Sequence, residues 1–470
     1  MNVQRLKTIF TMSVLAAAVA ACASPPPLPD SQWPAWPASF KEESARFTAA
    51  KPGEAQPRGE WWKSFADPVL DELVARADRN NSSIQVAAAR LKQARAIARI
   101  TDADRMPQLG AGASVSRVEG FVNNTGGPAR SFGSVGANLG YEVDLFGKLS
   151  RASDAAYLDA QSREALLQST RLLVQAEVAQ TYLALRALDV ERALVRGTVV
   201  AYRGTLDLTE RRFRAGDVAE LDVARARTEV AATESEALAL DRRRTELEHA
   251  LAVLVGEATP NFDLPAGEWN TALPVIPAGV PATVLARRPD VSAAQSSMIA
   301  AQQRVGVAQT AWFPDIALTA TGGYASPELG DLFKWSARAW GVGALLSLPI
   351  FDGGRRTAGI ENASAQFDEA VARYREQILT AFRDVDDQLS SLRLLADQAE
   401  AQARAVDSAA RTTSLSDSRY RNGLVSQLEL LDARRSELRN RRQALQVRAA
   451  QYQATVGLVR ALGGAWSGAT

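Results

Sequence analysis

Two long tracts of the chain carry apolar residues at the spacing of an amphipathic helix. Residues 129–259 and 350–470 contain no proline and are rich in Ala, Leu, Arg, Glu and Gln, which favour helices. Within them, "ALLQSTRLLVQAEVAQTYLALRAL" and "ILTAFRDVDDQLSSLRLLADQAEA" repeat apolar residues at intervals of three and four. Both tracts are predicted to form long helices, and the small residues on their apolar faces allow close packing.

A second pattern, in which apolar and polar residues alternate, predicts four strands. They are expected at about 108–118, 132–146, 315–325 and 338–351. Their length and alternation are typical of membrane strands with an outward apolar face. A soluble hairpin with one face on a core is the alternative. However, four strands leave free edges and cannot close a barrel, for which eight is the usual minimum, so several chains are expected to contribute.

The chain is an internal repeat. A shift of 207 residues places Pro107 on Pro314 and Gly216 on Gly423. Each copy is predicted to contain a helix of about 23 residues, two strands, a helix of about 63 residues and a last helix of about 40 residues. The two shorter helices then stack end to end beside the long one, each side spanning roughly 95 Å. Such a thin rod needs lateral neighbours. The predicted parts are a first repeat at 61–256, a linker at 257–288, a second repeat at 289–464 and a tail at 465–470.

The N-terminus predicts export and lipidation. Arg5 and Lys7 precede an apolar run from Ile9 to Ala21, which is too short to span a bilayer. It ends in small residues directly before Cys22, the only cysteine. This resembles a lipobox, so residues 1–21 are predicted to be a signal peptide and Cys22 to carry lipid. An incidental thiol is the alternative. Residues 22–60 are predicted to form an extended arm, and no later run is apolar enough for a transmembrane helix.

The composition argues against several other functions. The chain has 54 Lys and Arg against 53 Asp and Glu, and this balance argues against a nucleic-acid partner. The only histidine, His249, lies in a predicted helix, and the sequence contains no metalloprotease, C-x-x-C or P-loop motif. We therefore expect neither an enzyme nor a bound metal, and no cofactor apart from the lipid on Cys22.

Several motifs together resemble those of the TolC-like outer-membrane factors, NodT-type lipoprotein branch. They are "EWWKSFADPVLDELV" (60–74), "YEVDLFGK" (141–148), "LPVIPAGVPATVLARRPDVSAAQ" (273–295), "FPDIALTATGGY" and "LPIFDGGRR" (348–356). The resemblance implies a mainly α fold with a membrane β-barrel part. It further implies a homotrimer, in which a 12-stranded barrel continues into a long α-helical periplasmic tunnel, with 257–288 and the C-terminus as an equatorial belt.

The same resemblance implies a function. The chain would be the outer-membrane exit duct of a tripartite efflux system and a passive conduit for drugs or other small toxic compounds. Its partners would be a periplasmic membrane-fusion adaptor and an inner-membrane transporter of the resistance–nodulation–division type. Two alternatives remain open: a duct for type I protein secretion, and a non-conducting structural lipoprotein. The four strands favour a channel over the second.

Two glycine turns are candidate docking sites. Gly216 and Gly423 lie in "RRFRAGDVAELDVARAR" and "SRYRNGLVSQLELLDARR". Glycine permits the positive φ that ends a helix. Because the turns occur at matching points of both repeats, we expect them, with Arg214 and Arg421, to form the tips that dock the adaptor. A helix cap without further function is the alternative.

The acids behind the second turn are candidate gate residues. Glu429 and Asp432 are three residues apart and therefore share one helix face. By motif, they match acids that ring the closed entrance of TolC-like channels. Arg435 or Arg421 is the expected pairing partner, and Asp222 occupies the position of Glu429 in the first repeat. The alternative is a solvated helix face with ordinary charges.

Overall fold

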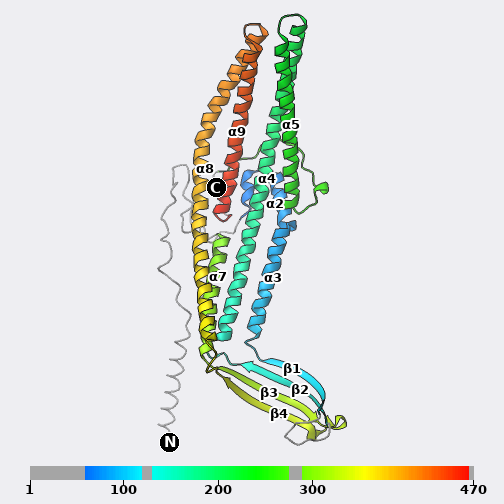
Figure 1. Ribbon diagram of the computed structural model, residues 1–470, viewed down its shortest axis with the longest axis vertical. Coiled ribbons are helices and arrows are strands. Elements are labelled where there is room, and N and C mark those ends of the chain that lie inside the picture. The colour runs from blue at the N-terminus through cyan, green and yellow to red at the C-terminus, as the bar shows by residue number, and fades with distance from the viewer. Residues whose placement is uncertain (1–58, 119–129, 275–287, 465–470) are drawn as a thin grey trace. The chain divides into compact units, whose positions relative to one another are not determined.

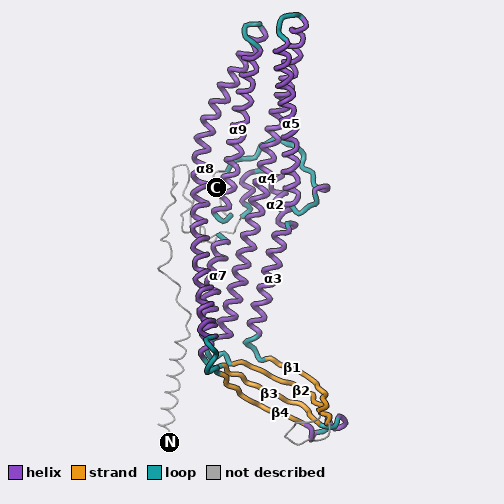
Figure 2. The backbone as a smooth tube through the Cα atoms, viewed as in Figure 1, coloured by secondary structure: helices purple, strands orange, loops and turns teal. Residues whose placement is uncertain are grey.

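The computed structural model describes residues 59–118, 130–274 and 288–464, and these are mostly helical (Figures 1 and 2). The predicted signal peptide 1–21, Cys22, all but the end of the arm 22–60, the linker residues 275–287 and the tail 465–470 lie outside the described residues. Among the helices of the described part, none is both long and apolar enough to cross a membrane.

The elements occur in the same order in both halves. The first half contains η2 (Trp61–Phe65), α2 (Pro68–Asn80), α3 (Ser82–Ala103), β1 (Gln108–Val118), β2 (Arg130–Glu142), α4 (Lys148–Arg214), α5 (Glu220–Leu254) and η3 (Thr259–Asn261). The second contains α7 (Pro289–Gln309), η4 (Thr310–Trp312), β3 (Asp315–Ser326), η5 (Leu329–Asp331), η6 (Trp335–Ala337), β4 (Arg338–Ser347), α8 (Arg355–Arg421) and α9 (Gln427–Ala461). The repeat shift relates both ends of α4 to those of α8, and both ends of α5 to those of α9.

Two strands end earlier than their alternating pattern predicts. β2 spans 130–142 rather than 132–146, because Asp144 accepts the backbone N–H groups of Leu149 and Ser150 and so begins α4. β4 spans 338–347 rather than 338–351, since Pro349 has no N–H for the ladder. The alternation therefore continues beyond the strands into the turns that start the long helices.

The helix lengths also differ from the prediction. α4 and α8 have 67 residues rather than about 63, and α5 and α9 have 35 rather than about 40. The short helix α2 is not among the predicted elements. Its start is nevertheless encoded locally, since Asp67 accepts the N–H groups of Val69 and Leu70 and Pro68 occupies the first turn.

The described residues form two compact units, of which one contains 89–164 and 293–376. This unit holds an antiparallel sheet in the order β1-β2-β3-β4 (Figure 2). Val135 lies opposite both Ala113 and Tyr324, and Ala320 lies opposite Val342. Directly opposed residues share a face of the sheet. Most apolar residues of the four strands therefore lie on one face, as their alternation predicts, whereas Phe132 and Leu345 lie on the other.

The other face carries small and polar residues. Ser114, Ser134, Asn138 and Thr321 lie on it, as follows from the strand register. Gly136 and Gly323 oppose each other on this face, and a Cβ at Gly323 would clash with the backbone of Val135. Glycine allows the close approach of the two strands here. The polar face is therefore crowded where the strands of the two repeats meet.

The second unit contains 35–88, 165–292 and 377–470, of which parts are described. In it, α4 and α5 form one antiparallel hairpin and α8 and α9 form another (Figure 1). Buried Tyr202 and Val230 of the first hairpin pack with Leu431 of α9, and Leu438 of α9 packs against the cluster around Val195. The two repeats of this unit thus share a hydrophobic interface.

Candidate functional site

Both glycine turns adopt the predicted conformation. Gly216 has φ of +86° and Gly423 has φ of +71°. After each long helix, an N–H group reaches back five residues: Asp217 to the carbonyl of Arg212, and Leu424 to that of Arg419. A Cβ at either glycine would meet no atom within 4 Å. The glycines are therefore required for backbone conformation, and the space beside both turns is open.

The predicted tip arginines contact their own helices. Arg214 donates to the carbonyl of Glu210 at 3.3 Å, and Arg421 pairs with Asp417 at 2.8 Å, one helical turn earlier. Within the described residues Arg421 is thus paired with an acid of its own helix, and its pairing with the candidate gate acids stays a prediction. Both side chains are exposed, and they lie beside the glycine turns as the sequence indicates.

The candidate gate residues have unequal surroundings. Asp432 is 61% exposed and lies 3.3 Å from Arg435, so the second expected pairing is present. Glu429 is exposed, and its N–H donates to the side chain of Ser426, the N-cap of α9. Asp222 lies 3.9 Å from Arg225 on its own helix. The structure thus provides a cap position for Glu429 and leaves the carboxylate of Asp432 largely open to solvent.

Arg435 also links the two repeats. It forms a two-pronged ion pair with Glu229 of α5, whose side chain is only 15% exposed. A hydrogen bond from this guanidinium to Glu229 raises the pKa of Arg435. One turn of the helix therefore carries both the exposed acid and the arginine that fastens α9 to α5.

Two further arginines of α9 bridge the repeats and lie outside the predicted site. Arg434 donates to the carbonyl of Ala201 at 3.1 Å and to the hydroxyl of Thr205, both on α4. Arg442 pairs with Glu191 of α4 at 2.7 Å and with Glu236 of α5.

A sequence signal for these pairs exists. The separation in sequence is 206 both for Glu229–Arg435 and for Glu236–Arg442, one short of the repeat shift. Along each helix the paired residues are seven positions apart, and this spacing returns them to the same face. When the two copies are aligned, each acid of α5 falls next to the position of its arginine in α9. This adjacency would have predicted both bridges.

Tyr420 adds an aromatic contact at the base of the second tip. The guanidinium of Arg212 lies 4.8 Å from the centre of its ring, and the two hydroxyls of Thr209 and Tyr420 are 3.4 Å apart. Tyr420 is buried, and Arg212 and Thr209 belong to α4. We call Arg434, Arg435, Arg442 and Tyr420 the bridge residues, because each fastens the second hairpin to the first.

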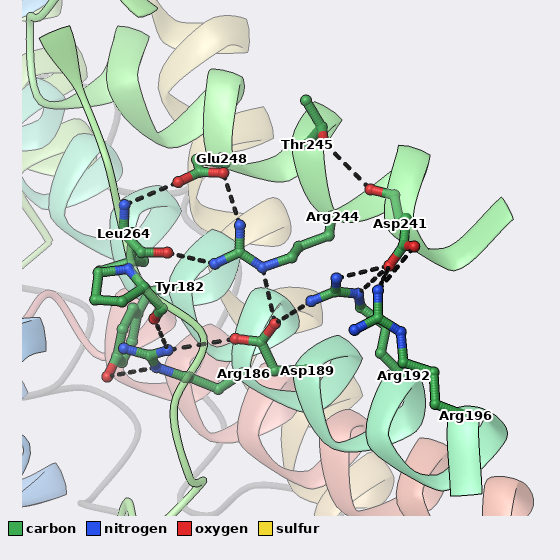
Figure 3. Close-up of polar contacts among 11 residues, drawn as sticks. Tyr182, Arg186, Asp189, Arg192, Arg196, Asp241, Arg244, Thr245, Glu248 and Leu264 are labelled. Carbon is green, nitrogen blue, oxygen red and sulfur yellow. Dashed lines mark hydrogen bonds and ion pairs between the residues drawn. The ribbon is translucent and has the colours of Figure 1, made fainter. Parts of the chain in front are cut away.

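A second charged site holds part of the linker against the first hairpin (Figure 3). Its centre is Asp189, whose side chain is 3% exposed and accepts from Arg186 at 3.3 Å, Arg192 at 3.2 Å and Arg244 at 2.9 Å. Arg186 also donates to the carbonyl of Pro265 at 2.9 Å. We call the residues labelled in Figure 3 the clamp: Tyr182, Arg186, Asp189, Arg192, Arg196, Asp241, Arg244, Thr245, Glu248 and Leu264.

The clamp reaches the linker backbone a second time. Arg244 donates to the carbonyl of Leu264 and pairs with Glu248 at 2.7 Å, and Glu248 accepts the N–H of Leu264 at 2.8 Å. Three polar groups of the linker backbone, including the carbonyl of Pro265, are therefore satisfied by side chains of α4 and α5. The described part of the predicted belt, up to residue 274, is thereby fixed in place.

The hydrogen bonds of the clamp extend to Asp67, near the start of the described part of the chain. Arg186 donates to the hydroxyl of Tyr182, which donates to Asp67 at 2.8 Å; Asp67 also accepts from Thr271 at 2.7 Å. Burial raises the pKa of Tyr182 to about 12, with Arg186 opposing the shift and Asp67 adding to it. Asp67 thus caps α2 and holds the linker through the same carboxylate.

The central carboxylate of the clamp and its partners from α5 are not repeated in the second copy, although Arg186 maps on Arg393. The shift of 207 residues places Asp189 on Ala396, Arg244 on Gln451 and Glu248 on Thr455. The copies therefore share their helix lengths but not this charged site.

The described residues offer little that suggests catalysis. Within residues 59–118, 130–274 and 288–464, no group of three or more His, Cys, Asp or Glu side chains is arranged to hold a metal ion. The acids at the tips and in the clamp are paired with arginines or open to solvent. The arrangement is that of a helical framework whose two hairpins are fastened together by arginines.

Comparison with known proteins agrees with this architecture. The family model described as outer membrane efflux protein matches residues 73–257 and again 280–464. The chain is 34% identical over 442 residues to the solvent efflux pump outer membrane protein SrpC of Pseudomonas putida, covering 93% of each. It is 33% identical over 430 residues to the pyoverdine export outer membrane protein OpmQ of Pseudomonas aeruginosa, covering 90% of each. Its fold is similar to the outer-membrane channel OprN, with a TM-score of 0.86 and 29% identity over 95% of this chain and 100% of that one.

Proposed function

Because the chain belongs to the outer membrane efflux protein family, we propose that it is the passive exit duct of a tripartite efflux system. In this proposal it receives its cargo from a periplasmic adaptor and an inner-membrane transporter of the resistance–nodulation–division type. The cargo is a drug or another small toxic compound. The similarity to a solvent efflux protein favours small molecules over a secreted protein. The chain itself performs no chemistry.

The observation that carries the proposal is the two-faced sheet. One face is mostly apolar along all four strands, with Arg338 as an exception, and the other carries mostly glycine, serine, threonine and asparagine, with Phe132 and Leu345 as large apolar exceptions. Within the described residues, β1 and β4 each have one edge without a partner strand. A membrane sheet must satisfy its backbone groups laterally, so these edges need further strands. Three copies supply a 12-stranded barrel with the apolar face toward lipid and the polar face toward the lumen.

The tips supply a reason for a gated entrance. In a trimer, three copies of Asp432 face one another around the threefold axis, together with Glu429 and with Asp222 from the first repeat. Like charges at short range repel unless they are paired. Arg435 supplies that pairing and at the same time fastens α9 to Glu229. The bridge residues hold this entrance closed, and their release widens it.

Two further roles complete the proposal. The open space beside Gly216 and Gly423 leaves room for the backbone of the adaptor, with Arg214 and Arg421 beside it. Cys22, outside the described residues, carries the lipid that anchors the chain to the outer membrane. Its anchor adds about 0.8 kcal/mol for each buried CH₂ group.

Planar-bilayer recording tests the channel and the gate together. The purified chain should form cation-selective pores, and Asp432→Ala should raise single-channel conductance and weaken cation selectivity. The matched control is Asp407→Ala, which removes an exposed acid of α8 well before the second tip turn. No pore formation by the wild type would refute the duct. Unchanged conductance and selectivity in Asp432→Ala would refute the gate alone.

A further inference from the structure

The segment 327–337, which joins β3 to β4, folds onto the apolar face of the sheet. Leu329 and Leu332 lie over Gly133, where an added Cβ would come within 2.7 Å and 3.9 Å of their side chains. Gly133 shares the apolar face with Val135, two residues along β2. The ring of Phe333 lies 6.0 Å from that of Tyr324, which is on the same face. The segment therefore covers the end of the apolar face and does not extend freely from the sheet.

The same segment exposes large aromatic side chains. Phe333 is 74% exposed and Trp335 is 73% exposed, and Trp340, in the adjoining row of the apolar face, is 76% exposed. This exposed aromatic area continues directly into the apolar face, with Val342 the next residue of β4 on that face. Exposed aromatic rings at the border of an apolar band are typical of the interface between membrane and water.

A cation lies among these rings. Arg338 stands opposite Tyr324, so its side chain emerges on the apolar face, in the last row before the segment. Its guanidinium lies 4.2 Å from the centre of the Trp335 ring. Within the described residues Arg338 has no acidic partner, whereas Lys334 of the same segment pairs with Asp331 at 2.6 Å. Arg338 is thus a positively charged group, held against an aromatic ring, at the edge of an apolar surface.

We propose that residues 329–340 form a lipid-headgroup anchor, in which Phe333, Trp335 and Trp340 lie in the headgroup layer and Arg338 binds lipid phosphate. Aromatic rings have an apolar body and a polar edge, and arginine places its stem along apolar surface while its charged end stays in a polar layer. Phosphate matches the guanidinium of Arg338 in charge and geometry. This proposal rests on the proposed membrane location of the sheet.

The anchor fixes the depth of the sheet in the membrane. The segment lies at the end of the sheet where β3 passes to β4, whereas β2 and β4 lead to α4 and α8 at the other end. The anchor therefore marks the leaflet remote from the helices. The apolar rows from Val342 to Leu346 lie within the hydrocarbon layer below it.

Spin-label depth measurements test the anchor in the full chain reconstituted in phosphatidylethanolamine and phosphatidylglycerol vesicles. Cys22 is the only native cysteine and its sulfur is taken up by the proposed lipid, so single labelling sites are introduced by Phe333→Cys, Val342→Cys and Thr321→Cys, with the unsubstituted chain as the control for labelling at Cys22. Accessibility to oxygen and to a water-soluble nickel complex should place the label at 333 at headgroup depth, 342 in hydrocarbon and 321 in water. Adding Arg338→Gln should move the label at 333 toward water, whereas Lys334→Gln should not.

The outcomes separate this anchor from the proposed duct. An aqueous label at 333 beside a label in hydrocarbon at 342 would overturn the anchor and leave the membrane sheet intact. An aqueous label at 342 would refute the membrane sheet and the anchor together. A measurement without labels guards against misfolded variants: lipids brominated near the headgroup should quench the fluorescence of the wild type more than that of Trp335→Phe. Equal quenching would also overturn the anchor.

Discussion

Replacing Asp189 with asparagine removes the negative charge at the centre of the clamp while keeping the size of the side chain. Three arginines donate to this carboxylate, and its side chain is only 3% exposed. Solvent therefore cannot replace the lost charge. The perturbation acts on the linker, because Arg186 and Arg244 hold the carbonyls of Pro265 and Leu264.

The expected magnitude follows from the contacts that survive. Removing one partner of a buried ion pair costs about 3–5 kcal/mol, since the remaining charge is left uncompensated. Here Arg244 keeps Glu248, and Arg186 keeps the hydroxyl of Tyr182. We therefore expect the lower end, about 3 kcal/mol. Release of the linker from α4 and α5 should then become about 100-fold more frequent, since roughly 1.4 kcal/mol corresponds to a factor of ten.

Limited proteolysis measures this release directly. A glutamate-specific protease cleaves after Glu268, an exposed linker residue four positions beyond Leu264, only when the surrounding backbone is free to enter its active site. Cleavage at Glu268 in Asp189→Asn should be about 100-fold faster than in the wild type when opening and closing outpace cleavage. The matched control is Asp207→Asn, because Asp207 is 57% exposed and its one ion-pair partner among the described residues is Arg211 of its own helix.

The control sets the scale for refutation. An exposed ion pair is worth less than about 1 kcal/mol, so Asp207→Asn should change cleavage less than about fivefold. If Asp189→Asn changed cleavage at Glu268 no more than this control, the clamp would not hold the linker. Faster cleavage at Glu257 and Glu268 alike, together with an unchanged helical circular dichroism spectrum, would show that the whole linker is released while α4 and α5 remain folded.

Three further predictions concern single positions. Gly423→Ala should cost about 1–2 kcal/mol through its positive φ alone, whereas Gly256→Ala should cost more, because its Cβ would come within 2.5 Å of the carbonyl oxygen of Asn80; thermal unfolding midpoints compare the two. Because burial raises the pKa of Tyr182 to about 12, its neutral form stabilises the fold fully below pH 10, and roughly 2–3 kcal/mol is lost as the pH rises through 12; Tyr182→Phe should flatten alkaline unfolding in this range. Burial acts to raise the pKa of Asp241, but hydrogen bonds from two arginines outweigh it and lower the pKa, so its contribution is present at neutral pH and is lost as the pH falls below about 4. Asp241→Asn should reduce acid sensitivity by less than about 1 kcal/mol, as measured by unfolding from pH 2 to 6.

The elements and their faces could be predicted because they depend on local signals. Glycine at 216 and 423 ends the long helices, and alternation predicts which residues of β1–β4 share a face. Asp67 and Pro68 carry a local signal for the start of α2 as well, although the helix is too short for its apolar spacing to stand out. The strand ends differ from the prediction because alternation continues into turns, and only the caps at Asp144 and Asp352 show where each helix takes over.

The charged sites could not be predicted in the same way, because their partners are far apart in the chain. Asp189 and Arg244 are 55 residues apart, and Arg186 reaches a carbonyl 79 residues away. A backbone carbonyl is present at every residue, so the sequence does not indicate which one a guanidinium will bind. The bridges of Arg435 and Arg442 are an intermediate case, since the repeat spacing would have revealed them once the two copies were aligned.

The equal lengths of α4 and α8 restrict how this chain can change over time. Inserting one residue into a helix turns everything beyond it by about 100° and advances it by about 1.5 Å. One insertion in the middle of α4 would carry Tyr182, Arg186 and Asp189 away from the linker, although no residue had been substituted. A substitution on these helices changes the contacts of one residue, whereas an insertion changes the contacts of every residue beyond it. A change in length is tolerated more easily in the turns that join strands to helices, where the two copies already differ: five residues separate β2 from α4, and seven separate β4 from α8.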